Sequence, residues 1–226
     1  TYAASEKLSL TAGYMGTFIG YEVISPLANF HYSTSYLFTT GPFQNAGIKA
    51  NYAVSSKVGL MVGLFNDQWN TYQATPEFGL NAFGAQLTVT PAEGFTAYFN
   101  LLTGSESGTI VDLTAAYQMS PKFKLGLNAA DYSGVESGSG YSGLALYPSV
   151  AISDTFGLGL RAESFKSKTT DTSVAAFTLS ANLKSGGLTF IPEIRLDSAS
   201  EKEFYSSNGN PTKSASQVAL AMVYGF

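Results

Sequence analysis

The sequence predicts an all-β protein: one antiparallel, up-and-down transmembrane β-barrel of about 12 strands, with short turns at one end and longer loops at the other. Three observations support this fold class. Segments of about ten residues alternate between apolar and polar side chains, the period expected of strands with two different faces. The connections between the segments alternate between short and long. Charged residues make up only 12% of a chain that is 45% apolar.

Composition narrows the chemistry open to this chain. It has no Cys, which excludes disulfide bonds, thiol catalysis and thiolate metal sites. No stretch of about 18 apolar residues occurs, so a transmembrane helix is not expected. The net charge of −4 argues against a nucleic-acid partner. We expect no cofactor, and the sequence shows no zinc-type cluster of metal ligands.

The expected strands cover the chain as a single domain, residues 1–226. In one of them, Leu60 and Val62 share an apolar face while Gly59 and Gly63 occupy the other. Pro148 falls inside another stripe, where we expect a local break because proline has no backbone N–H. Strands are predicted at 7–14, 44–54, 57–65, 76–90, 95–101, 111–119, 123–129, 144–152, 156–163, 175–183, 188–197 and 216–226.

The connections alternate in length along the chain. Those near Ser55, Pro91, Ser120, Ser153 and Ser185 are short, and the intervening ones are mostly longer and more polar. Outer-membrane barrels have short periplasmic turns and longer extracellular loops, and an even strand number leaves both termini on the periplasmic side. A Greek-key sandwich has no reason to keep this order. A soluble β-sandwich or a lipocalin-like barrel is the alternative fold.

Aromatic residues give a second indication. They lie on the apolar face of their strands and close to short turns, where the interfacial girdle of a membrane barrel is expected. The last strand ends on two of them, and this ending resembles the C-terminal strand of outer-membrane barrels. That resemblance implies an insertion signal at Tyr224 and Phe226 for the barrel assembly machinery. The girdle candidates are Tyr52, Phe95, Tyr117, Phe123, Phe156, Tyr224 and Phe226.

Charged residues within the strands fall on the face opposite the apolar one, which would be the lumen. Both signs occur, and the Arg161/Glu163 and Glu193/Arg195 pairs are expected on strands separated by a single strand. One interpretation is a transverse field across a narrow pore, and the alternative is an ion-pair network that closes the lumen. We expect the narrow pore. Its predicted lining residues are Lys49, Asp112, Lys124, Arg161, Glu163, Glu193 and Arg195.

The segment 25–43 is unusually aromatic for an outer loop. An apolar loop tends to bury itself, and the mouth of the barrel is the nearest space. We therefore expect this segment to fold inward and narrow the lumen. The alternatives are that its aromatics form an outer-leaflet girdle or that residues 32–38 form another strand. The predicted constriction residues are Glu22, Asn29, Phe30, His31, Tyr32 and Tyr36.

Two motifs could suggest catalysis or cofactor binding. Residues 138–143 match G-x-G-x-x-G, but they lie in a Gly/Ser-rich loop before a strand rather than between a strand and a helix. His31 is the single His and lies near Ser33, whereas a hydrolase would need a Ser–His pair with an orienting polar group. We expect His31 to pack among loop aromatics, and we assign no catalytic residue.

Residues 13–47 also carry a family resemblance. The residues that carry it are Gly13, Thr17, Gly20, Tyr21, Glu22, Asn29, Tyr32, Ser33, Ser35, Tyr36, Leu37, Phe38, Gly41, Pro42, Phe43 and Gly47. With these residues the chain resembles the OmpL-like β-barrel porin family of Gram-negative outer membranes over about residues 13–70, and it departs from the family pattern at Asn45 and Ala46. The resemblance implies a pore-forming barrel.

These features together predict an outer-membrane porin, not an enzyme, that lets small polar solutes or ions diffuse passively. Its expected surroundings are lipid and small solutes in the outer membrane of a Gram-negative bacterium, and it could form a homo-oligomer or join a membrane protein complex. A non-conducting accessory barrel of a larger complex and an outer-membrane hydrolase are the alternative functions.

The last strand generates a first prediction. Replacing Phe226 with Asp should impair assembly in cells more than the same change at Ser214. The reason is that a misplaced edge strand in lipid leaves backbone groups unsatisfied, at several kcal/mol for each group. Assembly is measured from heat-modifiable mobility in outer-membrane fractions, and equal assembly of the two variants would argue against an insertion signal.

Overall fold

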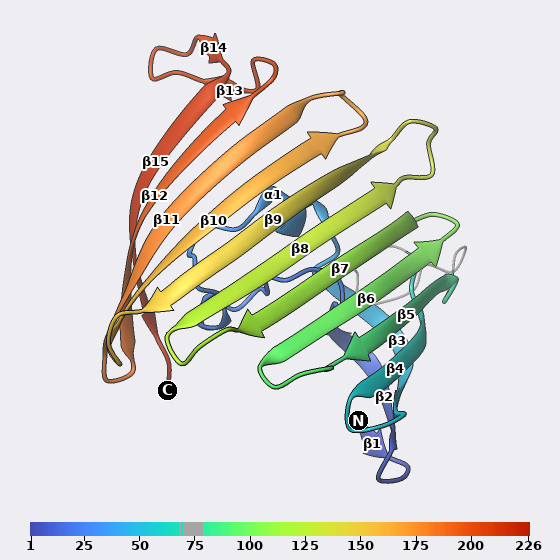
Figure 1. Cartoon of the computed structure of the whole chain (residues 1–226). Coiled ribbons are helices and arrows are strands. Elements are labelled where there is room, and N and C mark those ends of the chain that lie inside the picture. The colour runs from blue at the N-terminus through green and yellow to red at the C-terminus, as the bar shows by residue number, and fades with distance from the viewer. Residues whose placement is uncertain (68, 70–78) are drawn as a thin grey trace.

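The computed structural model describes residues 1–67, 69 and 79–226, and these residues form mainly one large, curved antiparallel sheet (Figure 1). The strands are β1 (Tyr2–Ala3), β2 (Leu8–Gly16), β3 (Gln44–Ala53), β4 (Val58–Phe65), β5 (Ala82–Val89), β6 (Phe95–Gly104), β7 (Gly108–Gln118), β8 (Phe123–Ser133), β9 (Gly140–Ala151), β10 (Phe156–Ser167), β11 (Ser173–Ser185), β12 (Leu188–Ala199), β13 (Phe204–Tyr205), β14 (Pro211–Thr212) and β15 (Ser214–Tyr224).

The strand order confirms the up-and-down prediction. In the described residues the large sheet has 13 strands, and each strand from β1 to β12 pairs with the next one in sequence, with β15 after β12. Strands β13 and β14 form a separate hairpin within the connection from β12 to β15. Without the two-residue β1, the large sheet of the described residues has 12 strands of 8–13 residues each, which agrees with the predicted number of about 12 strands.

Helical structure is limited to a 3₁₀ turn, η1 (Pro26–Ala28), and a short helix, α1 (Tyr36–Thr40), both in the connection from β2 to β3. Among the described residues, neither is long and apolar enough to cross a membrane.

The two ends of the sheet differ in their connections. We call the end with short turns the turn rim, and the opposite end the loop rim. At the turn rim, Ser55 accepts hydrogen bonds from the amides of Lys57 and Val58, and Ser120 does the same for Phe123. A serine at the start of a tight turn thus satisfies amides that the ladder leaves unpaired. The turn rim contains residues 54–57, 90–94, 119–122, 152–155 and 186–187.

The two faces of the sheet have opposite character, as the alternation in the sequence predicts. On β11, Phe177 and Leu179 are each 51% exposed on the convex face, while Thr178 and Ser180 are fully buried on the concave face. The convex face exposes apolar side chains on most strands, including Leu60, Val62, Leu64, Leu144, Leu196 and Leu220. An apolar surface this extensive suits contact with lipid rather than water.

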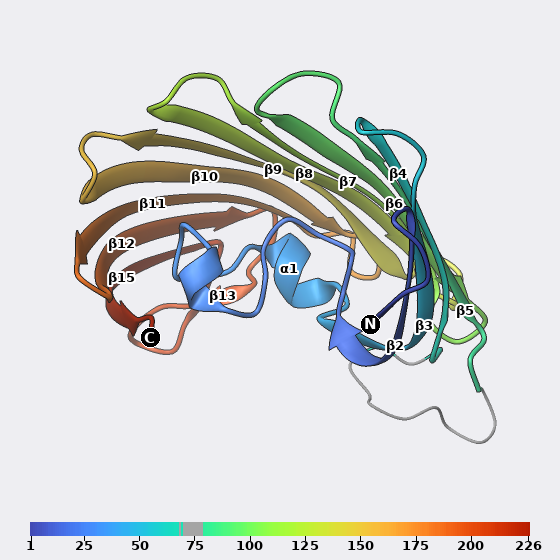
Figure 2. The same cartoon turned by 90° about the horizontal axis from the view of Figure 1, so that it is seen from below.

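The described strands curve around a central space without closing (Figure 2). Strand β1 pairs with β2 at one edge and β15 pairs with β12 at the other, and within the described residues β1 and β15 are not hydrogen-bonded to each other. The structure therefore differs from the predicted barrel at its seam. Alternation specifies which face of each strand is apolar, but it does not specify which edges meet.

Pro148 interrupts a ladder without shifting its register. Strands β9 and β10 pair through Ser149 and Gly159 and resume at Leu146 and Ala162, and the ladder is broken in between, beside Pro148. The predicted local break is present, but β9 continues through it. The missing proline N–H costs a ladder bond and leaves the alternation of side chains intact.

Two connections differ from the sequence prediction. Strand β5 begins at Ala82, whereas the predicted strand began at residue 76, and residues 76–78 lie outside the described part of the chain. The connection 105–107, expected to be long, is as tight as the short turns. Asp67 explains its tightness, because its carboxylate accepts hydrogen bonds from both the amide and the hydroxyl of Ser107.

The convex face generates a second prediction. Leu179 lies in the middle of β11 and its neighbours in register are Leu160 and Ile194, so Leu179→Arg should cost about 2–4 kcal/mol of stability in lipid if this site lies at the bilayer midplane. The matched control is Ser173→Arg, on the same face but at the loop rim, which should cost about 0–1 kcal/mol. Urea titration in lipid vesicles measures both, and a Leu179→Arg variant as stable as the parent would refute the assignment of faces.

Candidate functional site

The connection between β2 and β3 lies on the concave side of the sheet rather than outside it (Figure 2). We call residues 17–43 the inner segment. It includes the stretch 25–43 that the sequence predicts to fold inward, and it contains η1 and α1. Helix α1 packs against β9 and β10. The alternative that residues 32–38 form a strand is wrong, since they include the start of α1.

Two glutamates of the sheet hold the backbone of the inner segment. Glu163, on β10, accepts hydrogen bonds from the amides of Tyr36 and Leu37 at 3.0 and 2.9 Å. Glu193, on β12, accepts them from the amides of Tyr32 and Ser33 at 2.9 and 3.0 Å. Both side chains are buried, with 3% of their residue surface exposed. Each carboxylate thus binds a pair of consecutive amides, in the way that anions bind a backbone nest.

Arg161 binds the carbonyl side of the same backbone. It is fully buried on β10, donates to the Ser33 carbonyl at 2.6 Å and to the Thr34 carbonyl at 3.2 Å, and forms an ion pair with Glu22 at 2.7 Å. Glu22 also accepts bonds from the amide and hydroxyl of Ser35. This is a buried ion pair in which both terminal guanidinium nitrogens and the carboxylate bind the inner segment, while Nε of Arg161 is buried without a hydrogen-bond partner in the described residues.

Arg195 repeats this arrangement on β12. It donates to the Thr34 carbonyl at 2.7 Å and to the Asp197 carboxylate at 2.9 Å. Its guanidinium lies 4.9 Å from the centre of the Tyr36 ring, and the Tyr36 hydroxyl donates to Asp197 at 3.1 Å. A cation–π contact and a charge-assisted hydrogen bond therefore position the same aromatic side chain.

A third anchor binds the start of the inner segment. Asp112, on β7, accepts a hydrogen bond from the amide of Gly20 at 3.0 Å, and Asn128, on β8, accepts one from the amide of Tyr21 at 3.3 Å. The side chains of Asn100 and Asn128 both donate to Asp112. Asp112 is therefore buried with hydrogen-bond partners rather than with a counter-ion.

Glycines on the concave face provide space for aromatic side chains of the inner segment. A Cβ atom at Gly126 would collide with the Tyr21 ring, and one at Gly159 would collide with the Phe30 ring. The Tyr21 ring also stacks on Tyr147 of β9, with ring centroids 4.5 Å apart. Aromatic rings and strand glycines thus fit together where the backbone of the segment comes close to the sheet.

His31 is buried, and its Nδ1 atom lies 2.7 Å from the Ser180 hydroxyl oxygen rather than near Ser33. The Ser180 hydroxyl donates its one proton to Glu193 at 2.7 Å, so Nδ1 of His31 carries the proton in its bond to Ser180. Burial, and to a smaller extent the Arg161 charge, lowers the pKa of His31 to about 4, so the imidazole is neutral at pH 7. A catalytic triad needs the opposite arrangement, with the histidine between the serine and the carboxylate.

The other predicted site residues lie further apart. Asn29 bonds both the amide and the carbonyl of Val23, which closes the turn around η1. Tyr32 is 49% exposed, and Lys49 is half-buried on β3, away from the other charged residues of the site. Lys124 lies on β8 near the turn rim and lines a cavity described below. Asn182, on β11, donates to the Phe30 carbonyl at 2.8 Å.

The predicted insertion residues lie at the end of the chain, near the turn rim. Tyr224 pairs with Leu188 and is 61% exposed on the convex face. The rings of Tyr224 and Phe226 stack with centroids 6.4 Å apart. Their role as an insertion signal stays a prediction.

A model of the family described as "Putative beta-barrel porin-2, OmpL-like" matches residues 1–226. The chain belongs to this porin family. The resemblance that the sequence shows over residues 13–70 is thereby confirmed and extends to the whole chain. A comparison with curated proteins finds no match.

Solved outer-membrane porins have a similar fold. OccAB4 of Acinetobacter baumannii gives a TM-score of 0.64 at 8% identity, covering 98% of this chain and 63% of that one. The anion-selective porin from Comamonas acidovorans gives 0.61 at 12% identity, covering 79% and 59%. OprD of Pseudomonas aeruginosa gives 0.57 at 12% identity, covering 89% and 60%. At these identities the likeness establishes the fold. The chain spans about three fifths of the length of these porins.

Sequence reasoning missed the neutral members of the site in this porin. Asn100, Asn128, Thr178, Ser180 and Asn182 are all buried on the concave face and bind either the inner segment or its charged anchors. They alternate in step with the charged residues, so the period-two pattern places them on the concave face. A search for charged side chains alone does not find them.

The anchors generate a third prediction. Arg161→Met should release the inner segment at a cost of about 3–5 kcal/mol, because it leaves the buried Glu22 without its counter-ion. The cysteine-free chain allows a single reporter, Leu37→Cys, at a side chain that is 4% exposed. Maleimide labelling of this reporter should become faster in the Arg161→Met background.

The matched control is Lys213→Met, which removes a cation from the loop rim, where Lys213 lies 3.7 Å from the Glu201 carboxylate. Labelling in that background should stay as slow as in the parent. If Arg161→Met also leaves labelling unchanged in folded protein, the arginine is not the anchor.

Proposed function

We propose that this porin forms a narrow passage for passive diffusion of small polar solutes or ions across the outer membrane. Membership of a porin family carries the proposal. The two faces of the sheet support it, since an apolar convex face suits lipid and a polar concave face suits a water-filled lumen. Family and fold both indicate the outer membrane of a Gram-negative bacterium, with lipid and small solutes as its contacts.

The inner segment is the proposed constriction. It lies on the concave side at the level of the mid-strand residues Arg161, Ser180 and Glu193, which bind it. A segment held there narrows the lumen, and the narrowest part of a pore dominates its resistance. Insertion by the barrel assembly machinery and formation of a homo-oligomer are further proposals that rest on the porin assignment.

A hydrolase is the less favoured function. The contacts of Ser180 explain why, because its hydroxyl proton is directed to Glu193 and its oxygen accepts from His31. His31 therefore cannot take the serine proton without a change of tautomer. Membership of a porin family also favours a channel over an enzyme.

Single-channel recording tests the constriction and is the fourth prediction. The purified parent protein should give discrete conductance steps in planar bilayers, and deletion of residues 27–37 should raise the conductance of each step. The carboxylates that lose their amides in this deletion become accessible to water, which solvates them. A deletion of equal length at the loop rim, residues 201–211, is the control and should leave the conductance near the parent value.

Each outcome of the recordings contradicts a different hypothesis. A folded parent that never conducts would refute the pore and favour the accessory barrel. A parent that conducts, with a folded 27–37 deletion that conducts no better, would place the constriction elsewhere. Heat-modifiable gel mobility establishes that both deletion variants are folded before recording.

A further inference from the structure

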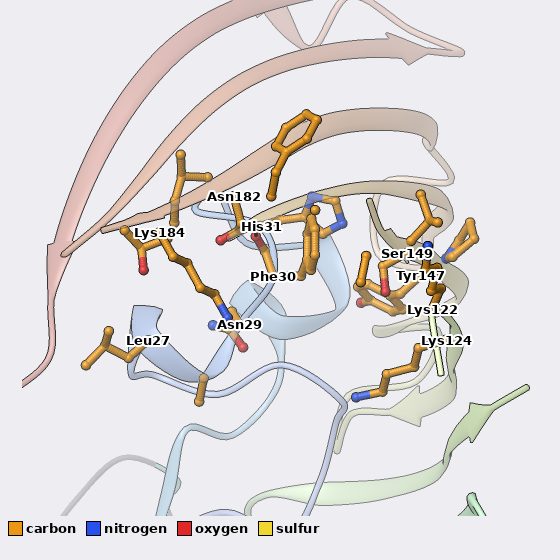
Figure 3. Close-up of a pocket in the computed structure, with 18 of the residues that line it drawn as sticks. Leu27, Asn29, Phe30, His31, Lys122, Lys124, Tyr147, Ser149, Asn182 and Lys184 are labelled. Carbon is orange, nitrogen blue, oxygen red and sulfur yellow. Dashed lines mark hydrogen bonds between the residues drawn. The ribbon is translucent and has the colours of Figure 1, made fainter. Parts of the chain in front are cut away.

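A cavity of ≈ 660 Å³ lies between the inner segment and the turn rim (Figure 3). Residues 26–31 of the inner segment form one wall, and the ends of β8, β9, β11 and β12 form the others. The turns 121–122 and 153–155 line it at the turn rim. This volume falls within the range of sites that hold small organic molecules.

Three lysines line this cavity: Lys122, Lys124 and Lys184. Among the residues that the structure describes, none of the three takes part in an ion pair. Figure 3 shows Lys124 and Lys184 extending into the cavity from opposite walls. Lys124 lies between Phe123 and Leu125, whose side chains face outward, so alternation along β8 directs the lysine inward.

The carboxylates of the cavity do not neutralise these cations. Glu22 lines the cavity but is bound to Arg161 and Ser35. Asp154 also lines it and lies exposed in a turn at the rim. The chain as a whole has a net charge of −4, whereas the lysines give the cavity a positive charge. A concave site lined by one sign of charge concentrates ions of the other sign.

The remaining lining is partly apolar and partly hydroxylic. Leu27, Phe30 and Tyr147 present apolar surface, and Ser149 and Thr189 add hydroxyl groups. A solute with a charged end and a small hydrocarbon part would contact both kinds of surface. Inorganic ions alone would use the lysines and leave the apolar wall without a partner.

We propose that the lysine cavity (Lys122, Lys124 and Lys184) is a binding site for small organic anions that carry a carboxylate or a phosphate group. The inference rests on the proposed pore and adds to it a preference for anions at the turn-rim mouth. Three ammonium groups that share a cavity repel one another, and a bound anion relieves that repulsion. Rings of lysine or arginine select anions in pores by the same interaction.

Ion selectivity provides the first test. Reversal potentials are recorded in a KCl gradient for the parent, for Lys124→Gln, for Lys184→Gln, and for the charge reversal Lys184→Glu. The parent should prefer chloride, each Gln variant should shift toward potassium, and Lys184→Glu should shift furthest. The control is Lys202→Gln, an exposed lysine of the loop rim, which should give the parent value.

Direct binding provides a second test that needs no conduction. The probes are inorganic phosphate, followed by ³¹P line broadening, and ¹³C-labelled acetate, followed by ¹³C line broadening, both with protein in detergent micelles. The resonance of at least one probe should broaden in the presence of the parent or of Lys202→Gln. Neither resonance should broaden in the presence of the doubly substituted Lys124→Gln/Lys184→Gln. Which probe responds distinguishes a phosphate from a carboxylate ligand.

The two tests separate the inference from the function on which it rests. A parent that is silent in bilayers but broadens a probe through the lysines refutes the pore and retains the anion site. A parent that conducts, with equal reversal potentials and equal line widths in all folded variants, overturns the anion site and retains the pore.

Discussion

The whole site depends on how the sheet satisfies the irregular backbone of the inner segment. Backbone outside helices and strands is tolerated at membrane depth only where protein or water meets its N–H and C=O groups. Here Glu163 and Glu193 accept pairs of consecutive amides, and Arg161 and Arg195 donate to carbonyls. Because carboxylates match amides and guanidinium groups match carbonyls, the concave face needs charges of both signs at these positions.

This pairing changes the meaning of the charges that the sequence displays. Arg161, Glu163 and Glu193 look like free pore-lining charges in the alternation, but in the structure they bind the inner segment. Lys122, Lys124 and Lys184 line the cavity at the turn rim, and in the proposed pore a solute would meet these cations there. The field at the mouth is therefore set by fewer residues than the sequence indicates.

The strand order, the two faces and the turns could be predicted because each rests on local information. Period-two alternation identifies the face of every strand, and a serine at the start of a turn identifies the turn at Ser55 or Ser120. The seam and the anchors could not be predicted, because they join distant residues. The contact of His31 with Ser180 spans 149 positions, so no local pattern in the sequence indicates it. Aromatic content alone indicated where residues 25–43 would lie, and it gave no information about their partners.

The anchoring of the inner segment through its main chain has a consequence for variation. Gly20, Tyr21, Tyr32, Ser33, Tyr36 and Leu37 are held by their amides, and Phe30, Ser33 and Thr34 by their carbonyls. Every amino acid except proline offers the same amide, so the scaffold recognises the path of the segment more than its side chains. Exposed side chains of the segment, such as Leu27 and Tyr32, can then vary while the path of the backbone stays fixed. Such a design allows one sheet to present different linings, and it offers a route to re-engineer what the passage admits while the wall stays untouched.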